Sequence, residues 1–325
     1  MKLLALYWSF MIIGYLLSTK LSKTSLDFSW VQKAMMCTIY VLCLLMGLRM
    51  GSNQQIIDNL GIIGVKSLIV TVFCIAGSMV FIFLTRKIFR MDRYGNVRGK
   101  AEETVAIATE EGGESNLKST LIILSVVVVG MASGYFILLK SMSEYLGKFD
   151  AFSNTALVVL LTILLFFVGF DLASQGGLFE NFRKVGLKAL AFPVAAILGT
   201  IVVGTASCLA MGLTVKEGVA ISIGFGWYTY APVVISAAGQ QYMIASAISF
   251  MYNVIRETSG IILIPVLAKK FGYIEATGVP GVAAMDVCMP IISRSCRPDT
   301  VVYSFMTGFA MCLATSIGVP LVMGL

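Results

Sequence analysis

Three residues that could do chemistry lie in the middle of one long apolar run, 242–267. Asn253, Arg256 and Glu257 are spaced three and four apart, so on a helix they share roughly one face. At 1.5 Å per residue, Glu257 would lie about 22 Å along that helix, near the centre of a bilayer. An ionised group there is costly and usually faces a water-filled cavity, a partner charge or a transported ion. The three residues therefore predict a cation- or proton-binding carboxylate tuned by Arg256, and a structural arginine–glutamate pair is the alternative.

A second acidic side chain, Asp286, lies alone in another apolar segment, 278–293. A carboxyl group at such depth tends to keep its proton unless a cation or a helix end is near. Helix ends at a chain break could also offer backbone groups to a zwitterionic ligand. Asp286 is therefore predicted to bind a substrate or an ion, and a helix-capping aspartate is the alternative.

A small glycine–aromatic motif precedes the long run, because Gly226 is followed directly by Trp227, Tyr228 and Thr229. Glycine permits irregular backbone, and aromatic rings can wall a pocket or contact an ammonium group. An aromatic belt at the membrane interface is the competing interpretation. Ser293, at the end of a related downstream segment, is also a candidate binding residue.

Two further charges, Arg49 and Asp171, close related apolar runs and are followed by the neutral residues Asn53 and Gln175. We expect these four residues to be either interfacial groups or gates on opposite faces of a membrane.

The surrounding sequence is typical of a membrane protein. It is 58% apolar and 13% charged, with a mean hydropathy of +0.90, whereas soluble domains are about 25% charged. The net charge of +7 does not indicate nucleic-acid binding, because the basic residues flank apolar runs. With no histidine and no metal-type cysteine spacing, neither a metal site nor a cofactor is predicted. The sequence also lacks the histidine–nucleophile pair of a histidine-based hydrolase and the glycine-rich phosphate loop of an ATP-driven pump.

The basic residues decide how the apolar runs cross the bilayer. The basic segment 86–100 is expected in the cytoplasm, which places both termini outside. The runs 219–238 and 278–293 fit better as re-entrant hairpins, because the basic residues that follow then also lie in the cytoplasm. The predicted fold is all-α, with eight transmembrane helices plus two re-entrant hairpins, and ten plain spans are the alternative.

The sequence contains two internal repeats. The segment 46–68 matches 168–190 at an offset of 122 residues, and 231–236 more weakly resembles 289–293. Inverted repeats with broken helices are typical of secondary transporters, and an ancient duplication without alternating access is the alternative. The predicted units are a three-helix repeat (1–90), a cytoplasmic connector (91–118), an inverted three-helix repeat (119–213), a hairpin with a long helix (214–270) and its inverted copy (271–325).

In combination, these motifs resemble the lysine exporter LysO family. The resemblance depends on Gly224-Phe225-Gly226-Trp227-Tyr228, on Arg256-Glu257 with Ile264-Pro265, and on Ala284-Met285-Asp286 with Pro290. Members of that family are bacterial inner-membrane proteins with eight spans and both ends outside, which export L-lysine. Their membrane-embedded acids match Glu257 and Asp286 here. Relatives often carry an acid at the position of Asn253, which puts the same charge count, and with it the substrate or coupling ion, in doubt.

The resemblance implies a transporter rather than an enzyme, in the bacterial cytoplasmic membrane, with L-lysine or a similar cation as its substrate. An inside-negative potential opposes export of a cation by about 2.3 kcal/mol per 100 mV, so we expect antiport with H⁺ or Na⁺. A cation/proton exchanger that uses the same acids and a non-transporting membrane protein are the alternatives. We expect the protein to be surrounded by a lipid bilayer and to have no nucleic-acid partner. A homo-oligomer is compatible with the sequence.

Overall fold

The computed structural model of the chain describes residues 2–21, 29–93, 122, 125–141, 143–174, 190–297 and 300–325. These residues form helices joined by turns and loops, which confirms the all-α prediction. The long helices are α1 (Lys2–Leu21), α2 (Ser29–Gly51), α4 (Leu60–Ile88), α6 (Leu146–Ser174), α8 (Ala191–Ala210), α11 (Met243–Lys270) and α14 (Thr300–Met323). The shorter ones are α3 (Gln54–Asp58), η1 (Gly134–Ser141), η2 (Ser143–Tyr145), α9 (Val215–Ser222), α10 (Ala231–Ala237), η4 (Gln240–Tyr242), α12 (Tyr273–Thr277), η5 (Gly281–Met285) and α13 (Met289–Ser295). Most of the predicted connector 91–118 lies outside the described residues.

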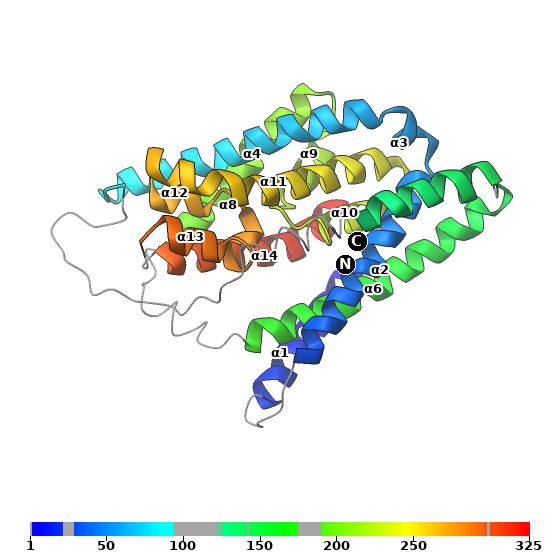
Figure 1. The fold of residues 1–325 in the computed structure, drawn as a ribbon, viewed down its shortest axis with the longest axis horizontal. Helices are drawn as coiled ribbons and strands as arrows, with labels where there is room; N and C mark the ends of the chain where they lie inside the picture. The colour runs from blue at the N-terminus through cyan, green and yellow to red at the C-terminus, as the bar shows by residue number, and fades with distance from the viewer. Residues whose placement is uncertain are drawn as a thin grey trace.

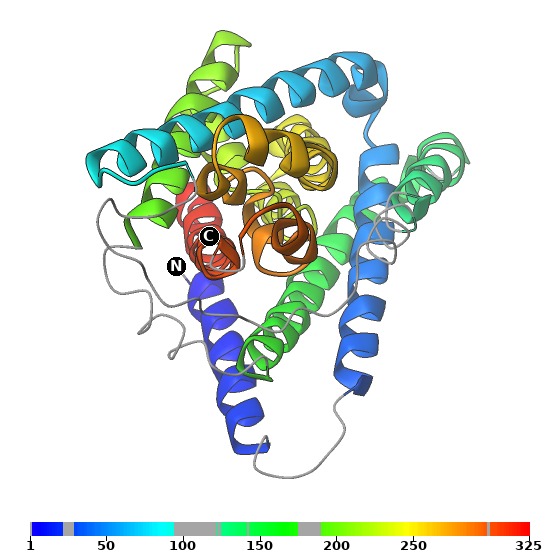
Figure 2. The ribbon, with the colours of Figure 1, turned by 60° about the vertical axis from the view of Figure 1, so that its left-hand side comes forward.

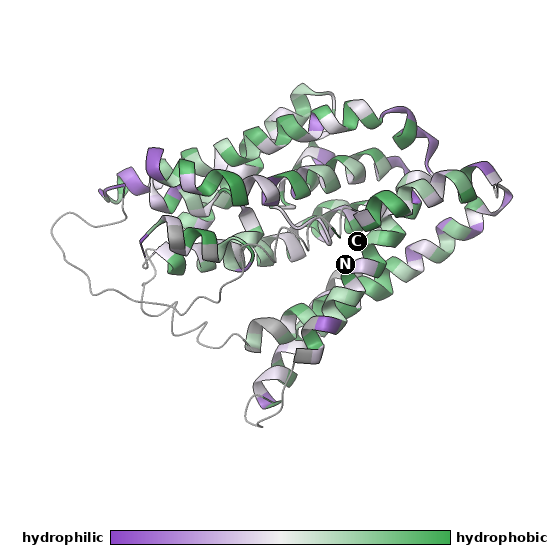
Figure 3. Cartoon of the chain, in the orientation of Figure 1, coloured by the Kyte–Doolittle hydropathy of each residue, from purple (hydrophilic) through white to green (hydrophobic). Residues whose placement is uncertain are grey.

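The described helices have the length and surface of a multi-pass membrane protein. Six of them are long and apolar enough to cross a bilayer: Lys33–Gly51, Leu60–Ile88, Leu146–Phe170, Ala191–Ala210, Gln240–Lys270 and Thr300–Met323. Two shorter apolar helices are Ala5–Leu21 and Ser125–Ser141. Hydrophobic residues cover the lengths of the helices, and hydrophilic ones gather at the helix ends (Figure 3). Outward side chains such as Ile62, Val65 and Val72 are more than half exposed, an apolar surface that lipid would cover.

The helices form two groups (Figures 1 and 2). In one group α1, α2, α6 and the helix Ser125–Ser141 pack on one another. In the other, α4, α8, α11 and α14 surround the short helices α9, α10, α12 and α13. Helices α4 and α8 approach most closely at Gly77 and Gly199, where a Cβ on either glycine would overlap the backbone of the other helix.

The chain between α8 and α11 folds back on itself at a non-helical segment, 223–230, here called the first break. At the start of α9, the Lys216 ammonium lies 5.0 Å from the ring centre of Tyr242, which directly precedes α11. At the end of α9, the carbonyl of Ser222 accepts from the hydroxyl of Tyr252, 3.4 Å away in the middle of α11. The segment therefore starts and finishes at the same end of α11, and its turn lies beside the middle of that helix.

A second interruption of α-helix, 278–288, separates α12 from α13 and contains the 3-10 helix η5; it is called the second break. The N–H of Tyr273, where α12 begins, donates to the carbonyl of Arg93 at 2.9 Å, so this segment starts near the end of α4. The hydroxyl of Ser304 on α14 donates to the carbonyl of Ala284 inside the break at 2.5 Å. Both α10 and α13 begin with proline in their first turn, where the missing N–H leaves no helical bond unmade.

Candidate functional site

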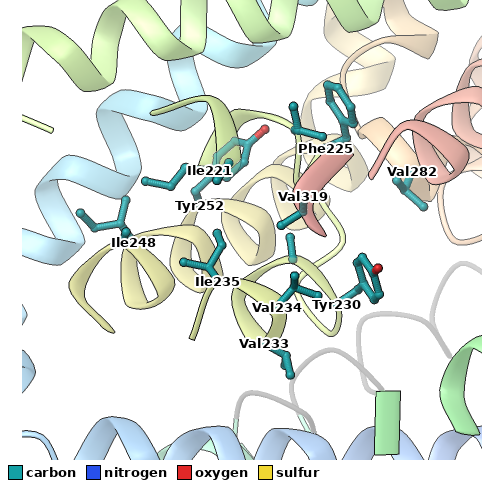
Figure 4. Close-up of a cluster of buried hydrophobic side chains, with 14 of the residues drawn as sticks. Ile221, Phe225, Tyr230, Val233, Val234, Ile235, Ile248, Tyr252, Val282 and Val319 are labelled. Carbon is teal, nitrogen blue, oxygen red and sulfur yellow. The ribbon is translucent and has the colours of Figure 1, made fainter. Parts of the chain in front are cut away.

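The two breaks meet beside the middle of α11. The N–H of Val282 in the second break donates to the carbonyl of Phe225 in the first, at 2.8 Å. Phe225 (φ 45°), Gly226 (φ 93°) and Gly281 (φ 72°) all have left-handed backbone conformations. Such a conformation is unfavourable for a non-glycine residue like Phe225 and persists only where its surroundings hold it in place. Figure 4 shows Phe225, Tyr252 and Val282 among the buried side chains around this junction.

Asn253 holds the first break against α11. Its side chain is fully buried, and its Oδ1 accepts from the N–H of Gly226 at 2.7 Å. Its amide nitrogen donates to the carbonyl and to the hydroxyl of Ser249, at 2.8 and 3.1 Å. Gly224 leaves room for this amide, because a Cβ there would lie 2.5 Å from Asn253 Nδ2. The predicted binding residue Asn253 therefore supplies a hydrogen-bond acceptor for the backbone of the first break.

Arg256 does the same for the second break. Its guanidinium donates to the carbonyls of Gly278 at 2.9 Å and Val279 at 3.1 Å. It also donates to the hydroxyls of Tyr252 at 2.8 Å and Thr200 at 3.4 Å. These carbonyls follow the end of the short helix α12, where unpaired acceptors favour a positive charge. Arg256 is thus a fully buried clamp between α11, α8 and the second break.

The two predicted acids lie near this junction. Glu257 is 6% exposed, whereas Asp286 is exposed and its Oδ1 accepts from the N–H of Val287 at 2.5 Å. The charges of both carboxyl groups act on Tyr228 in the first break and on Cys288 in the second. Two acids, one on α11 and one in the second break, therefore act electrostatically on the same phenol and the same thiol, and neighbouring negative charges favour binding of a cation or a proton.

The aromatic residues of the first break face different neighbours. Trp227 stacks on Tyr230, with ring centres 4.7 Å apart, and Tyr228 meets the ring of Phe250 edge-on at 6.3 Å. Thr229 is 6% exposed. The charges of Glu257 and Asp286 act on Tyr228.

Of the remaining candidates, Arg49 and Asn53 make described contacts outside the junction. Arg49, in the last turn of α2, contacts Ser236 on α10, and Asn53, which precedes α3, contacts Gln240 in η4. Ser293 is half-buried on α13. Asp171 belongs to the last turns of α6, and Gln175 lies outside the described residues.

Three participants escaped sequence reasoning. Tyr252 and Thr200 bind the Arg256 guanidinium, and the buried Cys288 feels the charges of both acids. A buried ion pair, Arg86 with Glu275 at 2.5 Å, also joins α4 to α12. Burial raises the pKa of the Glu275 carboxyl, and its hydrogen bond with Arg86 acts in the opposite direction. Only the spacing of Tyr252 from Arg256, four residues on one helix, was visible in the sequence.

Comparisons with known proteins give a consistent result. A family profile described as Lysine exporter LysO matches residues 8–97 and 124–323. A protein of Escherichia coli strain K12 named Lysine exporter LysO is 23% identical over 312 residues, which cover 94% of each chain. A protein of Haemophilus influenzae, provisionally named a lysine exporter, is 28% identical over 175 residues, covering 53% of this chain and 82% of that one. No solved structure matches.

Proposed function

The chain belongs to the lysine exporter LysO family, and from this premise we propose that it exports L-lysine, or a closely related cationic amino acid, across the bacterial cytoplasmic membrane. We propose antiport with H⁺ or Na⁺ through alternating access. The observation that carries the proposal is the junction of two chain breaks beside Glu257, where the charges of Glu257 and Asp286 act on the same groups. Broken helices that meet around a binding site are a recurrent construction of secondary transporters.

The proposed topology has eight spans and two re-entrant hairpins, with both termini outside. The contact between Lys216 and Tyr242 supports the first hairpin, because the two ends of the folded-back segment are neighbours. The bond from Tyr273 to Arg93 supports a common cytoplasmic end for α4 and α11. Lys269 and Lys270 lie at that end as well, in agreement with the preference of basic residues for the cytoplasm.

The proposed inverted repeats draw support from matched features of the two halves. Gly77 and Gly199 are 122 residues apart, the offset of the sequence repeat, and they make the same close contact from opposite sides of the α4–α8 pair. These two helices run in opposite directions, because Lys66 Nζ near the start of α4 donates to the carbonyl of Met211 after α8, at 2.9 Å. In the second repeat, α11 and α14 each contain one internal proline.

The acids supply the chemistry that a cationic cargo needs. L-lysine carries a net charge of +1, so a carboxylate in a low-dielectric site stabilises its side-chain ammonium. The membrane potential opposes its export by about 2.3 kcal/mol per 100 mV, which the inward movement of H⁺ or Na⁺ would offset. We assign Glu257 or Asp286 to the substrate and the coupling ion in turn. Asn253 and Arg256 hold the two breaks in place by forming hydrogen bonds with their backbone groups.

The test is efflux of labelled L-lysine from loaded proteoliposomes that contain the purified chain. Glu257→Gln and Asp286→Asn remove the charges and keep similar shapes, so at least one of them should abolish efflux. Glu144→Gln is the matched control, because Glu144 is exposed in η2, away from the breaks. Unchanged efflux in both site variants refutes the proposal. Flux of Na⁺ or H⁺ that does not depend on lysine would identify a cation exchanger instead.

A further inference from the structure

Arg49 is a buried arginine whose hydrogen-bonding capacity is largely unused. It is 1% exposed, and its Nη1 donates to the hydroxyl of Ser236 at 3.3 Å. Its Nε and Nη2 are buried and have no hydrogen-bond partner in the structure. Arg256, the other fully buried arginine among the described residues, reaches four acceptors. A buried guanidinium with unpaired N–H groups is unfavourable, which points to an anionic group as their binding partner.

An acidic group is held close to Arg49 without pairing with it. The charge of Asp150 on α6 acts on Arg49, but the two side chains form no ion pair in the structure. Instead, Asp150 Oδ2 accepts from the amide of Gln240 at 2.7 Å, and Gln240 Oε1 accepts in turn from the amide of Asn53 at 3.5 Å. The Asp150 carboxylate is therefore held by the Gln240 amide, and its charge still acts on the Arg49 guanidinium.

An open depression of about 470 Å³ lies at the same end of α2, and most of the residues that line it carry an amide or a hydroxyl group. Ser52, Asn53, Gln54 and Gln240 contribute to its wall. It lies one helical turn from Arg49, because the hydroxyl of Ser52 donates to the Arg49 carbonyl at 3.1 Å. The volume is in the range of small-molecule sites, and its wall offers amides and hydroxyls that can orient a polar ligand.

We propose that Arg49 and Asp150 form a second binding site, which takes the head group of an α-amino acid. The carboxylate binds the free N–H groups of the Arg49 guanidinium, whose planar fork matches two carboxylate oxygens. The α-ammonium binds Asp150. The site goes beyond the acids at the breaks, since it recognises the part that all amino acids share; it rests on the proposed function only for the identity of the cargo.

The place of this site in the fold gives it a role in release. Ser236 is one turn beyond Pro232, whose carbonyl accepts from the hydroxyl of Ser246 in the first turn of α11, at 2.7 Å. Arg49 therefore lies between the junction of the breaks and the end of α11 that faces outward in the proposed topology. A lysine that leaves the acids would be received here by its carboxylate and α-ammonium.

The experiment measures ligand-induced shifts in the melting temperature of the purified full chain. The ligands are L-lysine, L-lysinamide, which lacks the carboxylate, and Nα-acetyl-L-lysine, which lacks the α-ammonium. The variants are Arg49→Gln, Arg49→Lys, Asp150→Asn and the control Lys216→Gln, whose ammonium lies over the ring of Tyr242. Half-maximal shift gives an apparent affinity for each pair.

In the wild type, we expect both blocked ligands to bind at least tenfold more weakly than L-lysine. Arg49→Gln should lower the apparent affinity for L-lysine tenfold or more and leave that for L-lysinamide unchanged, so that the preference for L-lysine over L-lysinamide disappears. Lys216→Gln should keep this preference. Asp150→Asn should remove the preference for L-lysine over Nα-acetyl-L-lysine. If neither Arg49 variant folds, this variant alone tests the site. A preference that survives in Arg49→Gln or in Asp150→Asn, or no shift in the wild type at millimolar ligand, overturns the site. Binding without lysine counterflow would instead refute transport and leave this site standing.

Discussion

Replacing Gly281 by alanine tests the contact between the two breaks. Gly281 has φ 72°, a conformation that costs a residue with a Cβ roughly 1–2 kcal/mol. The added Cβ would also overlap the carbonyl oxygen of Phe225, a backbone atom that cannot swing aside. The overlap can be removed only if the two breaks move apart, which breaks the hydrogen bond from Val282 to Phe225. Loss of this bond costs about 1 kcal/mol net, and more when both groups stay buried. We expect a loss of about 3 kcal/mol in the free energy of unfolding.

Gly212→Ala is the matched control. Gly212 has φ 83°, but a Cβ there would meet nothing within 4 Å. This variant should therefore lose only the conformational part, about 1 kcal/mol. The difference of about 2 kcal/mol between the two variants isolates the steric contact between the breaks.

The assay is thermal unfolding in detergent at one scan rate, with lysine counterflow measured on the same preparations. A difference of 1 kcal/mol corresponds to about 2–4 °C for a chain of roughly this size, so Gly281→Ala should melt about 4–8 °C below Gly212→Ala. Its counterflow should also fall, because the junction positions Tyr228 and Cys288 near the acids. Equal melting temperatures and equal counterflow in the two variants would show that the breaks do not depend on this contact.

Three other changes probe the framework. Arg256→Met leaves two carbonyls of the second break without a donor and should cost about 3 kcal/mol in unfolding free energy; a melting curve like that of the wild type contradicts the clamp. Gly77→Leu should force α4 from α8 and reduce the yield of monodisperse protein on size exclusion, whereas Gly64→Leu meets open space and should not; matching elution profiles would argue against the close packing. Glu275→Gln leaves the buried Arg86 with a neutral partner and should lower the melting temperature by several degrees, and no change would rank this pair with weak surface ion pairs.

Local sequence features predicted the membrane class and proposed where the candidate site lies. The apolar runs are long enough to require a bilayer, and glycine and proline mark both interruptions of regular helix. The spacing of Asn253, Arg256 and Glu257 indicated one polar helix face, and the motifs around Gly226 and Asp286 indicated the family. Each of these features is contained in one continuous stretch of the chain, so it depends on local helical geometry and composition alone.

The tertiary structure decided what each polar residue contacts. Asn253 and Arg256 share a helix face, yet one holds the first break and the other the second. Arg49 meets Ser236 across 187 residues of sequence, and Arg86 meets Glu275 across 189. The periodicity of a helix predicts which side chains point the same way. Which residues those side chains then contact depends on how separate helices pack. The contacts that hold the breaks, and the idle guanidinium of Arg49, therefore appear only when the whole chain is folded.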